Sequence, residues 1–133
     1  MKRILVAYDG SEPARRALDT TIELAKLSGA LVTVASVVPV HPGRVPIDPW
    51  DDTAVHTQQL REAKQVLGEH GITAEFVRPH GDPAKEIEEL AETGAFDTIV
   101  VGSRRLGAVS RFLQGSVSEH VATHAGATVV ISR

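Results

Sequence analysis

The sequence predicts an α/β protein, namely a single-domain, doubly wound open parallel sheet with helices on both faces. Short apolar or β-branched runs alternate with longer amphipathic segments along the whole chain, which is the pattern of successive strand–helix units. Turn residues such as Asp-Gly and Ser-Gly separate these segments. The chain has 133 residues and is 42% hydrophobic, which is the size and composition of one globular domain, so residues 1–133 are expected to form a single domain.

The first 38 residues are expected to form a strand, a helix and a second strand. Residues 4–8 are a compact apolar run that ends at the turn Asp9-Gly10-Ser11. Ser11 can cap the following helix, which should end at Ser28-Gly29. Residues 31–38 are apolar and β-branched, as in a buried strand. Helical spacing predicts the buried face of this helix as Ala14, Ala17, Leu18, Thr21, Ile22 and Ala25.

The middle of the chain is expected to contain a loop, a helix and an edge strand. Residues 39–52 hold four of the seven prolines and the only tryptophan, so we expect a loop that crosses the surface or covers a cleft. Residues 53–69 should form a helix, and residues 72–78 alternate as in an edge strand. The candidate core positions of that helix are Val55, Leu60, Ala63 and Leu67.

The last third of the chain repeats the strand–helix alternation. Asp82-Pro83 should begin a helix whose glutamates form a solvated face. Residues 97–101 and 128–131 are expected to be the fourth and fifth strands, with a fourth helix over residues 116–124.

Composition excludes several classes of protein. The chain has no cysteine, so disulfides and thiolate catalysis are excluded. Acidic residues outnumber basic ones by 17 to 14, which argues against a nucleic-acid partner. The longest nearly apolar stretch, residues 30–40, is too short to span a bilayer, which takes about 20 residues, so we expect no membrane partner and a cytoplasmic location.

The ligand site is expected at the carboxyl ends of the strands, where the strand order of such sheets reverses. The first strand ends at Asp9-Gly10 and the fourth at Gly102-Ser103, so these two turns should flank a cleft. The segment after Gly102 contains three arginines and no acid up to Ser116. Ser116 and Glu119 then fit a capping box at a helix N-terminus. Such an N-terminus favours a small phosphorylated ligand, while a glycine loop and a capping box without a ligand remain the alternative.

These features resemble the universal stress protein family over nearly the whole chain. The resemblance is carried by residues 4–11, by Val100-Val101-Gly102-Ser103-Arg104, by Gly115-Ser116-Val117-Ser118 and by residues 128–131. It implies a five-stranded parallel sheet of order 3-2-1-4-5 and a homodimer. One branch of the family binds ATP through a motif of Gly, two residues, Gly, nine residues, then Gly-Ser or Gly-Thr.

This chain departs from that motif at one position. The frame reads Gly102, two residues, Arg105, nine residues, Gly115-Ser116, so its length is kept but arginine replaces the second glycine. Arginine is disfavoured where φ is positive, and its side chain can fill the space of the phosphates. Alternatively, its guanidinium can add a contact to phosphate.

The resemblance also implies the site residues and the function. By position, Ala7, Tyr8 and Val37 match the adenosine pocket, and Asp9 matches an acidic residue beside the nucleoside or metal, although it is also a typical turn residue. The positions matching ribose and phosphate are Gly102, Arg104, Arg105, Gly115, Ser116, Val117 and Ser118. The expected ligand is ATP, with or without Mg²⁺, in a stress-response or signalling protein that dimerises through its C-terminal strand. A nucleotide-free dimeric interaction protein is the alternative, and a slow ATPase is a third reading, with no catalytic residue assigned.

Overall fold

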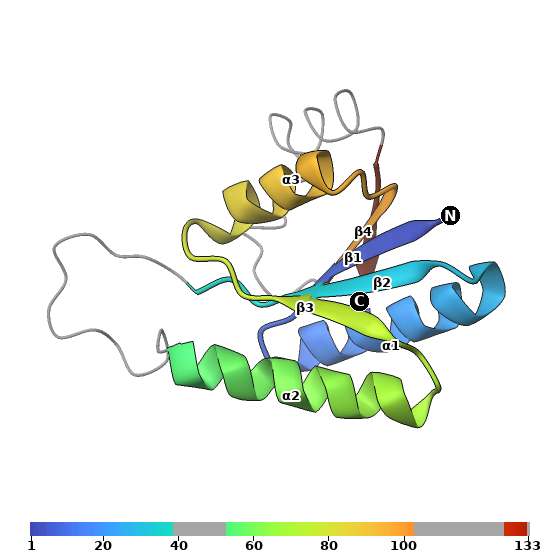
Figure 1. Ribbon diagram of the computed structural model, residues 1–133, viewed down its shortest axis with the longest axis horizontal. Helices are drawn as coiled ribbons and strands as arrows, with labels where there is room; N and C mark the ends of the chain where they lie inside the picture. Colours follow the sequence, from blue (N-terminus) through green and yellow to red (C-terminus); the bar gives the residue numbers. More distant parts are fainter. Residues whose placement is uncertain (39–52, 103–126, 133) are drawn as a thin grey trace, which may run out of the picture.

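The computed structural model describes residues 1–38, 53–102 and 127–132 (Figure 1). The predicted loop at residues 39–52 and the predicted helix at residues 116–124 lie outside this part of the chain. In chain order, the elements are β1 (Arg3–Ala7), α1 (Glu12–Ser28), β2 (Leu31–Ala35), α2 (Thr53–Glu69), β3 (Ala74–Val77), α3 (Pro83–Thr93), β4 (Thr98–Gly102) and β5 (Thr128–Ser132).

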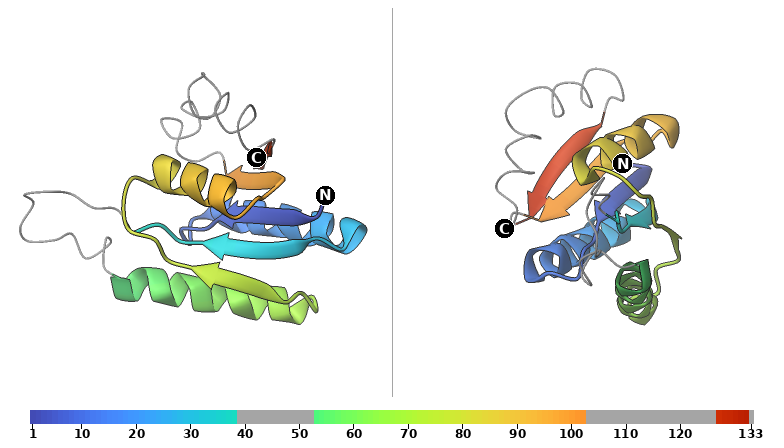
Figure 2. Two further views of the ribbon diagram at one scale, coloured as in Figure 1. Left: turned by 45° about the horizontal axis from the view of Figure 1, so that its top comes forward. Right: turned by 90° about the vertical axis from the view of Figure 1, so that its left-hand side faces the viewer.

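The five strands form one parallel sheet in the order β3-β2-β1-β4-β5 (Figure 2). The predicted fold class and strand order are therefore confirmed. The β1 strand lies at the centre, and β3 lies at an edge, as its alternating sequence predicts. The strand order reverses between β1 and β4, and the carboxyl edge at such a reversal is where α/β sheets of this type bind ligands.

Helices cover both faces of the sheet, with α1 and α2 on one side and α3 on the other (Figure 1). Because side chains alternate along a strand, Ile4 and Val6 of β1 pack with the α1–α2 side, whereas Leu5 packs with α3. All three are fully buried. The near-continuous apolar sequence of β1 reflects this burial on two faces.

The α1 helix begins and ends where its sequence predicts. The Ser11 hydroxyl accepts a hydrogen bond from the Ala14 N–H at 3.2 Å, which satisfies one backbone donor of the first turn. Gly29 ends the helix in the left-handed conformation, with φ at 72°. The six positions predicted for its inner face are all buried.

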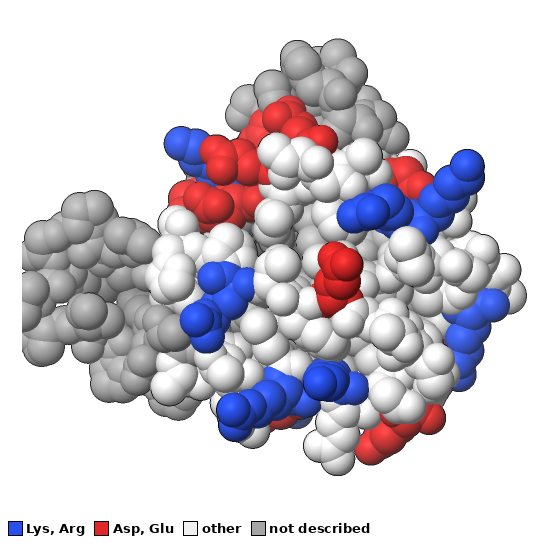
Figure 3. Space-filling view, viewed as in Figure 1, with Lys and Arg blue, Asp and Glu red and all other residues white. Residues whose placement is uncertain are grey.

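Acidic side chains gather over α3 on the face shown in Figure 3. Its glutamates Glu89 and Glu92 are exposed, while Glu86 and Glu88 are partly buried. The predicted solvated face is therefore confirmed for Glu89 and Glu92 and only in part for Glu86 and Glu88. The inner face of α3 contributes Ile87 and Ala91 to the core.

Two predictions need correction. The second strand is shorter than residues 31–38: β2 ends at Ala35, and Val38 forms only an isolated bridge with His80. In α2, Val55 is only partly buried and belongs to neither core cluster, whereas the adjacent His56 is 5% exposed. His56 is buried in place of Val55 because it has a polar partner just after β2: the Ser36 hydroxyl lies 2.6 Å from His56 Nδ1.

Candidate functional site

The carboxyl ends of β1 and β4 meet at one edge of the sheet. The two strands are parallel neighbours, with Ile4 opposite Thr98 and Val6 opposite Val100. The turn at Asp9-Gly10 follows β1, and Gly102 is the last residue of β4, so both lie at this edge. β1 and β4 therefore end at the same edge of the sheet, as expected, whereas Ser103 lies outside the described residues and the cleft between the two turns stays a prediction.

Gly102 brings the end of β4 into close contact with the first turn of α1. A Cβ atom added to Gly102 would lie 2.6 Å from both the carbonyl carbon and the carbonyl oxygen of Pro13. Real side chains do not approach a backbone so closely, so only glycine fits here. The close packing of β4 against α1 thus requires the first glycine of the motif, whether or not a ligand binds.

Asp9 shapes the turn between β1 and α1. Its Oδ1 accepts a hydrogen bond from the Ser11 N–H at 3.0 Å, and Gly10 has a φ of 76°. The interpretation of Asp9 as a turn residue is therefore confirmed. A carboxylate offers about four acceptor positions on two oxygens, so this turn bond does not preclude a ligand contact.

The adenosine-pocket candidates divide between the two faces of the sheet. Ala7 and Val37 are partly buried and pack against the α3-side core cluster. Tyr8 is 3% exposed and packs against the α1–α2 side. The Tyr8 N–H already donates to the Ala35 carbonyl at 2.9 Å. The side chain of Tyr8 is therefore separated by the sheet from those of Ala7 and Val37.

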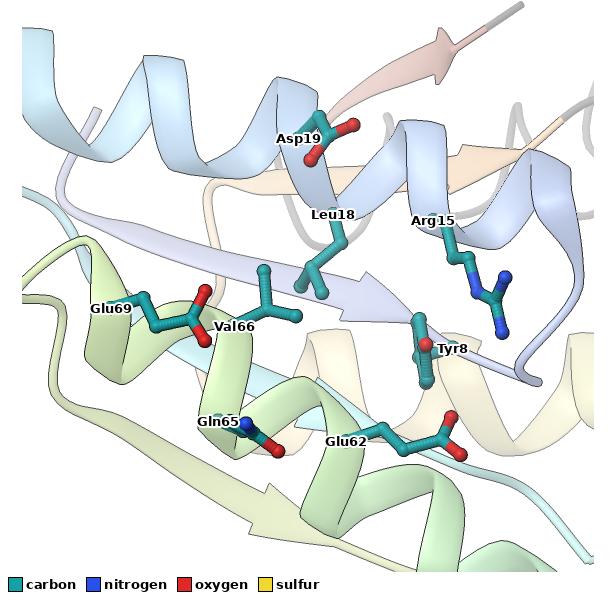
Figure 4. A pocket seen from close by; sticks show the side chains of 8 residues that line it. All are labelled: Tyr8, Arg15, Leu18, Asp19, Glu62, Gln65, Val66 and Glu69. Carbon is teal, nitrogen blue, oxygen red and sulfur yellow. The ribbon is translucent and has the colours of Figure 1, made fainter.

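Tyr8 lies at one end of a surface groove of about 460 Å³ between α1 and α2 (Figure 4). Leu18 and Val66 are its apolar lining, and the polar lining residues are Arg15, Asp19, Glu62, Gln65 and Glu69. Burial raises the pKa of Tyr8, and the charge of Glu62 raises it further, against a lowering by the hydrogen bond with Arg15. The Tyr8 phenol therefore ionises at a higher pH than an ordinary tyrosine.

A buried polar cluster joins α2 to the carboxyl end of β2. Ser36 is fully buried, its hydroxyl donates to Gln59 Oε1 at 3.0 Å, and it lies 2.6 Å from His56 Nδ1. The side chain of Gln59 also lies against Gly10, because a Cβ added there would be 3.2 Å from Gln59 Cγ. This cluster therefore contacts the ends of both β1 and β2.

Sequence reasoning missed this cluster, although a signal was present. The apolar stripe of α2 runs through Leu60, Ala63 and Leu67, and the same spacing continues to His56 rather than Val55. A histidine on that stripe, with Gln59 one turn later, indicates a polar contact inside an otherwise apolar interface.

The other candidate site residues lie outside the described part of the chain. These are Arg104, Arg105, Gly115, Ser116, Val117 and Ser118. Within residues 1–38, 53–102 and 127–132, no group of three or more histidine, aspartate or glutamate side chains is placed to hold a metal ion. Among the same residues, no helix is long and apolar enough to cross a membrane.

Comparisons with known proteins agree with this fold over its full length. The family model described as "Universal stress protein family" matches residues 1–133. Universal stress protein YxiE of Bacillus subtilis is 31% identical, with 98% of both chains covered. A universal stress protein of Thermus aquaticus is 34% identical, with 99% of this chain and 98% of the relative covered.

Two solved structures are similar in both sequence and fold. A universal stress protein in complex with cAMP has a TM-score of 0.73 and 28% identity, covering 99% of this chain and 97% of that one. The universal stress protein of Archaeoglobus fulgidus in complex with dAMP has a TM-score of 0.71 and 25% identity, covering 100% and 98%. With the family model matching every residue and the sheet order as expected, the chain belongs to the universal stress protein family.

Proposed function

We propose that this protein binds an adenine nucleotide, with ATP as its ligand, at the carboxyl edge of β1 and β4. The observation that carries the proposal is the convergence there of the Asp9-Gly10 turn and Gly102 on the first turn of α1. In doubly wound sheets, this edge at the reversal of strand order is the usual place for a ligand.

The relatives support the nucleotide class. Two similar solved structures hold cAMP and dAMP, both of which contain adenine. The sequence spacing from Gly102 to Gly115-Ser116 supports a phosphate-binding helix N-terminus, although residues 103–118 lie outside the described part of the chain. The negative charge of a triphosphate would also be attracted by the positive side chains of Arg104 and Arg105.

In this proposal, the residues at this edge of the sheet contact different parts of the nucleotide. Ala7 and Val37 would bound the adenosine, and the Asp9 carboxylate would accept hydrogen bonds from ribose hydroxyls. Residues 115–118 would bind phosphate through backbone N–H groups. Mg²⁺ commonly binds through one or two carboxylates together with substrate phosphates, and Asp9 fits that role by its charge and place.

We further propose that the protein acts as a homodimer in stress-response signalling. Among the described strands, β5 pairs only with β4, so its other edge has unpaired backbone groups. Its residues Val129, Val130 and Ile131 are only partly buried. Pairing with the β5 strand of a second copy would cover this edge around a two-fold axis.

The nucleotide proposal is tested by identifying what the purified protein carries and then by titration. We expect ATP or AMP in the extract of the denatured protein, measured by mass spectrometry, and binding of ATP by calorimetry. Asp9→Ala should weaken ATP binding about tenfold, since a hydrogen bond to a charged group contributes about 1.5–3 kcal/mol.

The matched control for this titration is Asp19→Ala, which removes an exposed carboxylate of α1 that lines the α1–α2 groove instead. This variant should bind ATP like the wild type. A clean extract together with no heat of binding would reject the nucleotide proposal and favour a nucleotide-free dimeric interaction protein. Release of phosphate from bound ATP would instead indicate a slow ATPase.

A further inference from the structure

We propose that Gln59 of α2 reads the nucleobase, by donating a hydrogen bond from its side-chain amide to an acceptor nitrogen of the adenine ring. This inference rests on the nucleotide proposal and assigns to the same site a specificity-determining residue on a different element. It follows from where Gln59 lies, how its amide is oriented and which of its hydrogen-bonding groups remains unused.

Gln59 lies between the carboxyl ends of the two strands that bound the proposed adenosine site. Its amide oxygen bonds to Ser36, the residue immediately before Val37. Its Cγ, Cδ and Nε2 atoms lie 3.2–3.5 Å from the position that a Cβ of Gly10 would occupy. Gly10 immediately follows Asp9. On the α2 side of this edge, the Gln59 side chain therefore contacts Ser36 and Gly10, which are the chain neighbours of the proposed nucleoside contacts Val37 and Asp9.

The orientation of the amide is set by a buried hydroxyl. Ser36 Oγ has a single proton, which it donates to Gln59 Oε1. Ser36 Oγ also lies 2.6 Å from His56 Nδ1, and it accepts a hydrogen bond from that nitrogen in the tautomer that carries the ring proton on Nδ1. Ser36 is fully buried and His56 is 5% exposed, so neither partner can turn toward solvent without losing this bond. In this arrangement Oε1 of Gln59 faces Ser36, and Nε2 lies on the other branch of the amide.

The remaining group is a hydrogen-bond donor. Among the described residues, Gln59 accepts a hydrogen bond at Oε1 and donates none from Nε2. An amide NH₂ carries two donors, and a partly buried donor gains from an acceptor supplied by a ligand. Adenine offers such acceptors as its ring nitrogens. A glutamine in this place would therefore add base recognition to a site whose other proposed contacts are to ribose and phosphate.

The test compares adenosine with its 1-deaza, 3-deaza and 7-deaza analogues, each of which replaces one ring nitrogen by C–H. Binding to the full-length wild type, Gln59→Met and Gln59→Glu is measured by calorimetry. For the wild type, we expect one analogue to bind about 3–10-fold more weakly than adenosine, the range for one neutral hydrogen bond. In Gln59→Met this difference should disappear, and adenosine itself should bind about 3–10-fold more weakly than it does to the wild type.

Two further variants separate base reading from general effects. Gln65→Met makes the same change on the exposed part of α2 and should keep the wild-type discrimination. Ser36→Ala removes the group that orients the amide and should reduce the discrimination while Gln59 is still present. Circular dichroism melts test whether each variant is folded. If Gln59→Met does not fold, the isosteric change Gln59→Glu takes its place.

Each remaining outcome counts against the inference. Equal adenosine affinity in wild type and Gln59→Met would overturn it, and so would discrimination that persists in Gln59→Met. A loss of affinity that is equal for adenosine and every analogue would show that Gln59 only packs against Gly10, which also overturns it. In all three cases adenosine is bound, so the nucleotide proposal stands; absence of binding to any adenine compound would reject both.

Discussion

The backbone N–H of Lys2 donates to Asp97 Oδ2 at 2.7 Å, joining positions 95 residues apart. The N–H of Arg3 donates to the same oxygen at 3.3 Å, and the Thr98 hydroxyl donates to Oδ1. The backbone of Asp97 bonds on to Arg3 and Thr128. One aspartate therefore joins the amino ends of β1, β4 and β5, at the edge of the sheet opposite the proposed site.

Replacing Asp97 should lower stability in a way that depends on pH. Burial acts to raise its pKa, but the hydrogen bonds from Lys2, Thr98 and Arg3 outweigh burial and lower it below 3.8. The stabilisation is therefore present above the unfolded pKa and lost as the pH falls through the folded pKa. Asp97→Asn should cost about 1–2 kcal/mol at pH 7 and less at pH 3, measured by urea denaturation. A cost that does not change with pH would contradict this account.

Gly102→Ala should destabilise the protein, because the new Cβ would lie 2.6 Å from the Pro13 backbone, which cannot move without shifting α1. Such overpacking typically costs about 1–3 kcal/mol. Gly68→Ala is the control, because a Cβ there meets nothing within 4 Å in the interior of α2. That change should stabilise by about 0.5–1 kcal/mol. Thermal melts that rank the two variants in the opposite order would refute the close-approach argument.

Tyr8, the single tyrosine, should ionise at a higher pH than an ordinary tyrosine. Its neighbours Glu62 and Arg15 should shift its pKa in opposite directions. Burial raises the pKa of Tyr8 above 10.0, so the stability that comes from the neutral phenol is lost only as the pH rises through the folded pKa. Glu62→Gln should lower this pKa, and Arg15→Gln should raise it. Tyrosinate absorbance reports the midpoint, with Glu69→Gln as the control from the same groove.

The proposed dimer makes a prediction about alternate residues of β5. The Thr128 N–H donates to Asp97, so the parallel ladder directs the N–H groups of residues 128 and 130 toward β4 and that of Val129 toward the open edge. Val129→Pro should therefore produce a folded monomer, whereas Val130→Pro should destabilise the sheet itself. Light scattering at micromolar concentration gives the mass. A wild-type monomer of 14.2 kDa would reject the dimer.

Most of the fold follows from local patterns that a single sequence carries. The Ser11 cap, the Gly29 end and the six inward positions of α1 each depend on residues within one or two turns. The polar cluster could not be found in this way, because Ser36 and His56 are 20 positions apart and their contact depends on how α2 lies on the sheet. The same dependence explains why the prediction of Val55 as a core residue is wrong. The strand order was obtained from family resemblance, not from local pattern.

The last prediction concerns Arg105, which stands where the ATP-binding motif has its second glycine and lies outside the described residues. If its guanidinium contacts phosphate, Arg105→Ala should weaken ATP binding about tenfold or more, since a hydrogen bond to a charged group contributes about 1.5–3 kcal/mol. Binding of adenosine, which has no phosphate, should change little.

The opposite role predicts the opposite sign. If Arg105 fills the phosphate space, the wild type should bind ATP poorly, and Arg105→Gly should restore binding by opening that space and by permitting positive φ. We expect the first result, because the spacing of the motif is kept and the sequence from Ser103 to Ser116 also contains Arg104 and Arg111 but no acidic residue. Titration of wild type, Arg105→Ala and Arg105→Gly with ATP and adenosine decides between the roles. Equal ATP affinity in all three would defeat both and leave Arg105 as a solvated surface residue.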